Sequence, residues 1–208
     1  MGKIFDGIYA TDGEITLRPM TAEDESAYRD IKMEHSKAYA VTEHFEPENN
    51  RKGYKRFIIG EIARMCAIVA DDKVIGYVGI NNITNPEWEI AIELRKDYMG
   101  RGIGPRAVKL LVNEIYAVTG RDTFQVRIMP DNIPSQKCFE KLGATFCGLP
   151  YSPFLSDEKS RENFIKRNPE YLTDEHMSAL AERFGVTPEK MMTSVIEYKL
   201  RAPIGGEK

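Results

Sequence analysis

A glycine-rich turn that leads into an amphipathic helix constrains this chain more than any other stretch. The turn runs from Met99 to Gly104 and has a glycine at every second position. Apolar residues then recur at spacings of three and four, which predicts a helix with one buried face: Ile103, Ala107, Leu110, Leu111, Ile115 and Val118. The uncovered N–H groups of the turn and the positive end of the helix dipole together predict an anion site. A strand-to-helix connection without a ligand is the alternative.

Two common phosphate-binding motifs do not fit this turn. Its spacing is not G-x-x-x-x-G-K-[ST], and a G-x-G-x-x-G dinucleotide fingerprint would need an acidic residue on the next strand, which is absent. A second motif, about thirty residues downstream, runs from Asn132 to Ala144 behind a strand-like run from Thr123 to Ile128. Asn132 is suited to cap a short helix, and Gly143 is suited to end it in the left-handed conformation.

The two motifs in this order resemble those of the GNAT superfamily of acetyl-coenzyme A dependent N-acetyltransferases. Met99 to Gly104 matches the Q/R-x-x-G-x-G/A loop, and Asn132 to Ala144 matches the N-x-x-S/A…E-K-x-G-F segment. Many members carry a tyrosine seven residues after the asparagine, where this chain has Phe139. Because of that difference and the sequence C-F-E-K-L-G, the chain resembles the ribosomal-protein N-terminal acetyltransferase branch of the superfamily more than its other branches.

The remaining patterns predict an α/β (α+β) fold with a mixed, mostly antiparallel central sheet and flanking helices. A strand from Ile15 to Met20 precedes a helix that Thr21 caps, and a second helical region is expected between His35 and Ile62. A hairpin from Cys66 to Ile83 follows, with its tight turn at Asp71-Asp72.

The strands from Trp88 to Leu94 and from Thr123 to Ile128 flank the long helix, so a crossover joins them and they should be parallel neighbours. The resemblance implies that these two strands splay apart and admit the pantetheine arm of the cofactor. We expect a single acetyltransferase domain over residues 1–208, with a helical insertion at residues 150–192 that interrupts the last hairpin.

The composition limits which kinds of partner and which cellular location can be expected for this chain. The formal net charge of -3 gives no general attraction to nucleic acid or to an anionic membrane. The apolar runs are too short to span a bilayer, and a basic-then-apolar signal is missing from the N-terminus, so a cytoplasmic location is expected. Three cysteines without CxxC spacing predict reduced thiols, and isolated histidines predict no metal site.

Residues 174–192 offer a competing function, because they look like a helix-turn-helix core with glycine in the turn. A DNA-binding regulator would need basic residues for the phosphates, yet acidic residues slightly outnumber basic ones from Asp157 to Lys190. A helical lid or the contact of a homodimer is therefore the preferred interpretation. The role of the insertion and the oligomeric state stay open.

The resemblance also implies a set of cofactor-binding residues. The diphosphate would lie on the N–H groups of the three glycines with Arg101 and Arg106 as partners, and Asn132 and Ser135 would contact the pantetheine arm. Met99 replaces the usual Gln or Arg, and the proline after the third glycine removes one N–H. The complete set is Ile92, Leu94, Met99, Gly100, Arg101, Gly102, Ile103, Gly104, Arg106, Asn132 and Ser135.

Acyl transfer from a thioester to an amine needs a base and a donor for the oxyanion. Glu89 and Glu93 are the candidate bases. Glu89 lies where many family members place a glutamate, whereas a solvated strand carboxylate or a salt-bridge partner is the better interpretation of Glu93. The two share a face of a regular strand, and a bulge, usual in the family, would separate them. The N–H of Ile92, Glu93 or Leu94 is the expected oxyanion donor.

These expectations combine into an N-acetyltransferase that uses acetyl-coenzyme A and no metal, and that acetylates a primary amine by direct attack. Cys138 or Ser135 could protonate the leaving thiolate in place of Phe139, although a packing role fits Cys138 equally well. A coenzyme A binding protein without efficient catalysis is the alternative. The acceptor is open: a protein N-terminus, a polyamine, an aminoglycoside or a small amino acid derivative. Residues that could line its site are Tyr39, Glu43, His44, Phe45, Glu46 and Glu48.

Overall fold

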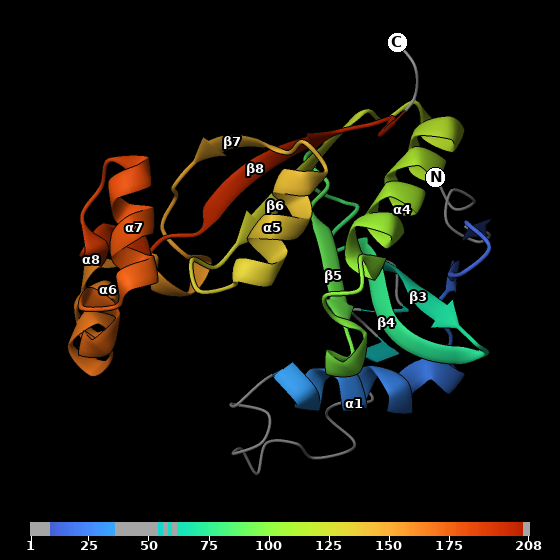
Figure 1. The fold of residues 1–208 in the computed structure, drawn as a ribbon, viewed down its shortest axis with the longest axis horizontal. Helices are drawn as coiled ribbons and strands as arrows, with labels where there is room; N and C mark the ends of the chain where they lie inside the picture. Colours follow the sequence, from blue (N-terminus) through green and yellow to red (C-terminus); the bar gives the residue numbers. More distant parts are fainter. Residues whose placement is uncertain (1–8, 36–53, 56–57, 60–61, 206–208) are drawn as a thin grey trace. The chain divides into compact units, whose positions relative to one another are not determined.

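The structure is a computed structural model that describes residues 9–35, 54–55, 58–59 and 62–205 (Figure 1). The chain divides into two compact units, residues 1–124 with 201–208, and residues 125–200. Most of the helical region expected between His35 and Ile62 lies outside the described residues, as do the acidic and aromatic residues between positions 39 and 48. That the whole chain forms a single domain stays a prediction.

The first unit is built on a five-stranded antiparallel sheet in the order β1-β2-β3-β4-β5. The predicted hairpin is confirmed as β3 and β4, joined by Asp71 and Asp72 with φ angles of 48° and 59°. Aspartate tolerates this left-handed conformation, which two-residue hairpin turns require. The strands are β1 (Ala10–Thr11), β2 (Thr16–Pro19), β3 (Arg64–Ala70), β4 (Lys73–Ile80) and β5 (Ile90–Leu94).

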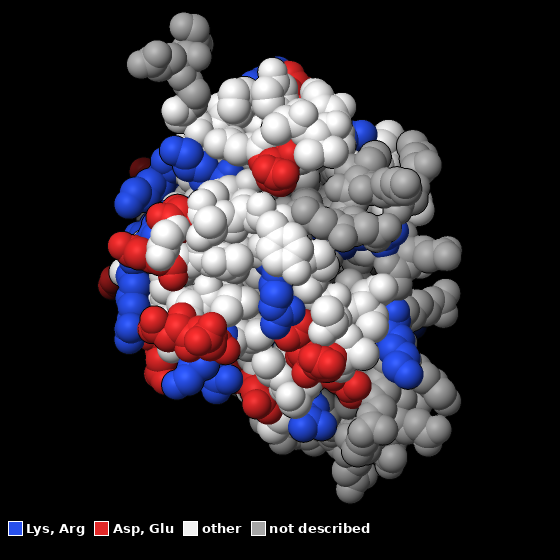
Figure 2. Space-filling model, turned by 90° about the vertical axis from the view of Figure 1, so that its right-hand side faces the viewer, with Lys and Arg blue, Asp and Glu red and all other residues white. Residues whose placement is uncertain are grey.

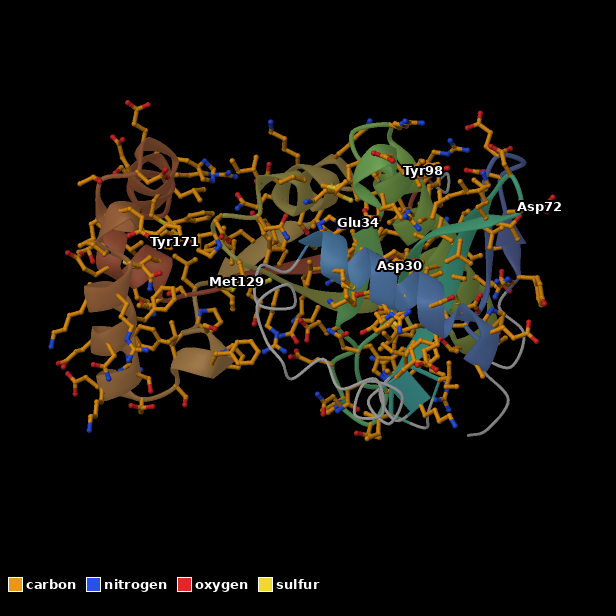
Figure 3. The ribbon with its side chains drawn as sticks, turned by 90° about the horizontal axis from the view of Figure 1, so that it is seen from below. Asp30, Glu34, Asp72, Tyr98, Met129 and Tyr171 are labelled. Atoms are coloured by element: carbon orange, nitrogen blue, oxygen red, sulfur yellow. The ribbon has the colours of Figure 1, made fainter. Side chains whose placement is uncertain are left out.

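Helices cover both faces of this sheet, and Figures 1 and 3 show α1 (Glu25–His35) on one face and α4 (Ile103–Thr119) on the other. Ile31 of α1 is buried against Tyr77 of β4 and its neighbours. The predicted amphipathic helix is confirmed as α4, although Val118 is exposed rather than buried. The buried residues of α4 are Ile103, Ala107, Val108, Leu111, Val112 and Ile115.

Thr21 caps the helical start as predicted, and a one-turn 3-10 helix η1 (Ala22–Asp24) precedes α1. Asp24 completes a capping box, because its carboxylate accepts the backbone N–H of Thr21 at 2.8 Å. The same buried carboxylate accepts both terminal nitrogens of Arg18 at 2.7 Å each. Burial alone would raise the pKa of Asp24, but the hydrogen bonds from Arg18 and Thr21 lower it overall.

Strand β4 lies very close to both of its neighbours at two glycines. A Cβ on Gly79 would lie 2.1 Å from the carbonyl oxygen of Arg64 in β3, and a Cβ on Gly76 would lie 2.5 Å from the carbonyl oxygen of Glu93 in β5. Backbone atoms cannot yield as a side-chain tip can, so only glycine fits at these two positions.

The second unit contains a three-stranded sheet in the order β6-β8-β7, in which β7 and β8 are antiparallel. The predicted helical insertion before the last strand is confirmed, since three helices and two 3-10 turns separate β7 from β8. The elements are β6 (Thr123–Ile128), α5 (Ile133–Lys141), β7 (Thr145–Gly148), η3 (Pro153–Leu155), α6 (Glu158–Arg167), η4 (Pro169–Leu172), α7 (Glu175–Phe184), α8 (Pro188–Met192) and β8 (Ile196–Arg201).

The chain leaves the first unit after residue 124 and returns to it at residue 201. The return is fixed by a hydrogen bond of 2.8 Å from the N–H of Ala202 to the carbonyl oxygen of Asp122. The amide of Asn113 on α4 then donates to the carbonyl and accepts from the N–H of Ile204, at 3.1 and 2.7 Å. The point of exit and the point of return are therefore neighbours in the first unit.

Within the ranges that the structure describes, none of the helices is both long and apolar enough to traverse a bilayer. The same ranges contain no group of histidine, cysteine and acidic side chains that could hold a metal ion.

Candidate active site

The glycine turn presents its backbone to open space at the start of α4. Gly100 and Gly102 have φ angles of 74° and 77°, and no heavy atom lies within 4 Å of a Cβ built on either. Gly102 is the N-cap of α4 and supplies no side chain to the first-turn N–H groups. Gly104 already belongs to the helix, where Pro105 follows without loss of an intrahelical bond. This arrangement suits an anion at the positive end of the helix.

The two arginines expected at the phosphates differ in their surroundings. The Arg101 guanidinium lies over the ring of Tyr98, at 5.2 Å from its centroid, and Arg101 is exposed at the turn. Arg106 is already paired, because its Nε donates to Asp12 at 2.6 Å and its Nη1 donates to Glu14. The hydrogen bond from Arg106 lowers the pKa of Asp12 to about 2. A phosphate contact by Arg106 would need this pairing to change.

Two residues of β5, Ile92 and Leu94, turn their backbone toward the outer edge of the five-stranded sheet, where the carbonyl oxygen of Leu94 already lies 2.6 Å from Nε2 of His35. The N–H of Arg95 donates to Ile75, and the N–H of Asn81 donates to Glu89, so the odd-numbered residues of β5 make the ladder bonds to β4. Antiparallel pairing alternates, and the N–H and C=O of Ile92 and Leu94 therefore point away from β4. An extended ligand can pair with such an edge as an added strand.

The register of β4 and β5 continues without a shift from Ile80↔Ile90 to Gly76↔Leu94, so the bulge considered for this strand does not separate Glu89 from Glu93. Both carboxylates therefore belong to one face. Glu93 Oε2 accepts Lys32 Nζ at 2.8 Å and also accepts the hydroxyl of Tyr77. The salt bridge favours a structural role for Glu93, while Glu89 is half-buried and stays a candidate base.

Three side chains from the last turn of α1 meet the end of β5, and sequence reasoning missed all of them as site residues. Lys32 binds Glu93, as described above. Glu34 accepts the N–H of Lys96 at 2.7 Å and pairs with Arg95 at 3.1 Å. Nε2 of His35 lies 2.6 Å from the carbonyl oxygen of Leu94. In the sequence these residues appear only as the polar end of a helix. Such a pattern does not predict contacts with residues about sixty positions away.

In the second unit, Asn132 caps α5 as predicted, and its side chain accepts the N–H of Ser135 at 3.1 Å. Asn132 is exposed and Ser135 is half-buried. Phe139, at the position where the family often has tyrosine, is only 2% exposed. Burial raises the pKa of the Cys138 thiol to about 11. The roles that the resemblance assigns to these residues stay predictions.

The sequence matches the acetyltransferase (GNAT) domain over residues 14–145, which is more than half of the chain. This chain belongs to the GNAT acetyltransferase family. It is therefore an acetyltransferase that transfers an acetyl group to an amine. The match spans the glycine turn, the edge strand β5 and the Asn132 motif. No curated protein sequence matches the chain.

Solved structures of other GNAT acetyltransferases resemble this fold. RimL, a ribosomal alpha-N-protein acetyltransferase in complex with coenzyme A, is 15% identical with a TM-score of 0.65 over 94% of this chain and 98% of RimL. A putative ribosomal-protein-serine acetyltransferase from Vibrio cholerae is 14% identical with a TM-score of 0.63 over 94% and 98%. A chimera of the Vibrio cholerae spermidine N-acetyltransferase SpeG and hSSAT is 12% identical with a TM-score of 0.62 over 91% and 96%. At these identities the likeness concerns the fold.

Proposed function

We propose that this GNAT enzyme takes its acetyl group from acetyl-coenzyme A and passes it directly to a primary amine, without a covalent acyl-enzyme. The observation that carries the proposal is the glycine turn at the start of α4, whose Gly100 and Gly102 leave open space in front of uncapped N–H groups. A diphosphate carries the charge that such a helix start attracts. RimL, which shares the fold, holds coenzyme A in its structure.

In this proposal the cofactor follows the edge of β5. The diphosphate lies on the turn from Gly100 to Gly104 with Arg101 beside it, and the pantetheine amides pair with the outward backbone of Ile92 and Leu94. The thioester follows both amides, so the outward N–H of Ile92 is the candidate donor to the thioester oxygen as negative charge develops on it. Asn132 and Ser135, at the start of α5, are the further candidates for the pantetheine arm.

The leaving thiolate receives no proton from a tyrosine in this proposal, because position 139 is a buried phenylalanine. Cys138 is a poor substitute, since burial raises its pKa to about 11 and the leaving thiol has an ordinary pKa of about 8.5. A proton would therefore move in the unfavourable direction. We infer that the thiolate departs without an acid from the protein.

The acceptor class is proposed from chemistry and from the related structures. RimL is described as acting on a ribosomal protein and SpeG on spermidine, so a protein N-terminus and a polyamine come first for this chain. On the face drawn in Figure 2, acidic and basic side chains are interspersed, so this face offers no continuous basic surface to the phosphates of a nucleic acid. A cytoplasmic location and a homodimer are also proposed.

Two matched variants test the cofactor site. Gly102 and Gly120 cap the two ends of α4 with φ angles of 77° and 73°, and a Cβ on either meets no atom within 4 Å. Alanine should therefore cost a similar strain of about 1–2 kcal/mol at both positions. Only Gly102→Ala should weaken acetyl-coenzyme A binding in calorimetry, by at least about tenfold. Equal affinity in the two variants would contradict the proposed site.

Thiol release from acetyl-coenzyme A across an amine panel tests the reaction. The panel contains N-terminal peptides, spermidine, an aminoglycoside and free amino acids. Turnover with one class identifies the acceptor. Tight binding of acetyl-coenzyme A without turnover on any member would instead favour a coenzyme A binding protein.

A further inference from the structure

Arg106 belongs to the proposed set of cofactor-binding residues, but two carboxylates from the turn between β1 and β2 already hold it. Its Nε donates to Oδ2 of Asp12 at 2.6 Å, and its Nη1 donates to Glu14. Arg106 lies four positions after the N-cap Gly102, and helix side chains lean toward the N-terminus of their helix. Its guanidinium can therefore reach either these carboxylates or an anion at the glycine turn.

The two members of this acidic pair, Asp12 and Glu14, are held differently. Asp12 is fixed, because its Oδ1 accepts the N–H groups of Glu14 and Ile15 at 3.1 and 3.0 Å. The hydrogen bond from Arg106 keeps the pKa of Asp12 at about 2, so this carboxyl is ionised near neutral pH. The side chain of Glu14 is 77% exposed, and it is the more easily displaced of the two.

The charges of this group oppose the binding of an anion. Two carboxylates against one guanidinium leave a net negative charge in the group. A diphosphate that approaches the turn therefore finds Arg106 neutralised until a carboxylate gives way, and the carboxylates repel it. Arg101 differs, since its guanidinium lies 5.2 Å from the ring centroid of Tyr98 and has no carboxylate partner within the described ranges.

Open space beside Arg106 gives its guanidinium room to change partners. A surface cavity of about 550 Å³ is lined by residues of β1, of the loop that follows it and of α4. The lining includes Asp12 and Arg106 themselves, and also Lys109 about one turn further along α4. Because the guanidinium borders this cavity, it can exchange one anion for another without displacing core residues.

We propose that the acidic pair regulates the cofactor site by competing with the diphosphate for Arg106. The inference rests on the proposed function, because it requires a diphosphate at the glycine turn. Acetyl-coenzyme A and the product coenzyme A carry the same diphosphate, so each replaces a carboxylate at Arg106 when it binds. The carboxylates return to the guanidinium when the product leaves. The pair therefore lowers the affinity for the cofactor and speeds the release of coenzyme A, a step that limits the turnover of many enzymes.

Calorimetry with coenzyme A at about 0.15 M salt tests this competition. A double variant, Asp12→Asn with Glu14→Gln, keeps polar side chains of similar size and removes both charges. It should bind coenzyme A at least about threefold more tightly than wild type, because Arg106 is no longer held by charged partners. In stopped-flow measurements coenzyme A should also leave the double variant at least about threefold more slowly.

Glu114→Gln is the matched control, because it removes a carboxylate from the lining of the same cavity. Glu114 lies eight residues after Arg106 on α4, or about 12 Å along the helix, which exceeds the Debye length of about 8 Å. Its loss should change the affinity for coenzyme A by less than about 1.5-fold. A gain as large as that of the double variant would show a general effect of charge and contradict the proposal.

An Arg106→Ala background shows whether the effect passes through the guanidinium. In this background the substitutions at Asp12 and Glu14 should change the affinity by less than about twofold, since there is no guanidinium to release. A gain of equal size with and without Arg106 would mean that the carboxylates simply repel the diphosphate, and the competition would be refuted.

Binding by the wild type separates failure of this inference from failure of the proposed function. Wild-type protein that does not bind coenzyme A would overturn the proposed function. Wild-type protein that binds it, with a double variant of equal or weaker affinity, would overturn the role of the acidic pair alone. A melting temperature for each variant shows that it is folded under the conditions of the titration.

Discussion

At the scale of single residues, Asp24 shows how one carboxylate joins several elements. It accepts two nitrogens of Arg18 in β2, the N–H of Thr21, and the hydroxyl of Thr21 at 3.2 Å. The sequence predicted the cap, because T-A-E-D has the residue types of a helix start. It did not predict Arg18 as a partner, since nothing in the pattern aims an arginine on a strand at the helix that follows.

We expect Asp24→Ala to lower the free energy of unfolding by about 2–4 kcal/mol. The variant leaves Arg18 partly buried without its carboxylate partner and removes the half of the capping box that Asp24 supplies to the N–H of Thr21. Urea unfolding followed by circular dichroism measures the change. Asp30→Ala, on the exposed face of α1, is the control and should change stability by less than about 0.5 kcal/mol. Equal losses in the two variants would show that the Asp24 network adds nothing.

The cysteines give a second expectation at this scale. Burial raises the pKa of Cys66 to about 12 and that of Cys138 to about 11, against an ordinary value of 9.0. At pH 8 the thiolate of Cys138 is therefore about 100-fold rarer than that of an unshifted thiol. Iodoacetamide labelling with peptide mapping should modify exposed Cys147 first and Cys138 at least about 100-fold more slowly than free cysteine. Labelling of Cys138 as fast as free cysteine would contradict its burial.

At the scale of elements, the close approach of β3 and β4 depends on a missing side chain. Gly79→Ala would bring a Cβ to 2.1 Å from the Arg64 carbonyl oxygen and 2.7 Å from the Cα of Met65. The strands would have to separate, so we expect a loss of more than about 2 kcal/mol in the free energy of unfolding. Gly148→Ala in β7 is the control, because no atom lies within 4 Å of its Cβ. It should change stability by less than about 0.5 kcal/mol.

The elements also show what a sequence can and cannot predict. The Asp71-Asp72 hairpin, the Thr21 and Asn132 caps and the amphipathic α4 depend on neighbours in the chain, and the structure confirms them. The contact between His35 and Leu94 depends on packing between distant segments, and no local pattern encodes it. The pairing of Arg106 with Asp12 was missed for the same reason.

The candidate site likewise contains residues that the sequence could predict and residues that it could not. Gly100 and Gly102 could be predicted because the motif itself requires glycine, and both have positive φ angles. The outward edge at Ile92 and Leu94 follows from β5 being the last strand of its sheet, which needs the whole sheet to be known. The residue roles inherited from the family stay predictions until cofactor binding is measured.

At the scale of the whole molecule, stability should fall in acid. Asp12 keeps a pKa of about 2 in the folded protein, against 3.8 ordinarily, because Arg106 donates to it. A lowered pKa stabilises the fold above about pH 4, and this contribution disappears as pH falls toward 2 and the unfolded chain binds the extra proton. The pair is partly exposed, so solvent screening keeps its contribution to stability small.

Thermal unfolding of wild type and Asp12→Asn between pH 7 and pH 2 measures this contribution. Asparagine can keep the bonds to the backbone N–H groups of Glu14 and Ile15 while losing the charge. The variant should be less stable at pH 7, and the difference should shrink as pH falls below about 4. A difference that stays constant across this range would rule out the charge of Asp12 as its cause.

The hydrogen bond from the N–H of Ala202 to the carbonyl oxygen of Asp122 has a mechanical consequence. Residues 125–200 form a loop whose two ends are clamped together inside the other unit. If residues 9 and 205 are pulled apart, tension crosses that clamp and bypasses the loop. The helical insertion should therefore carry no load until the clamp breaks, and its extension should follow as a separate, later step in a single-molecule force trace.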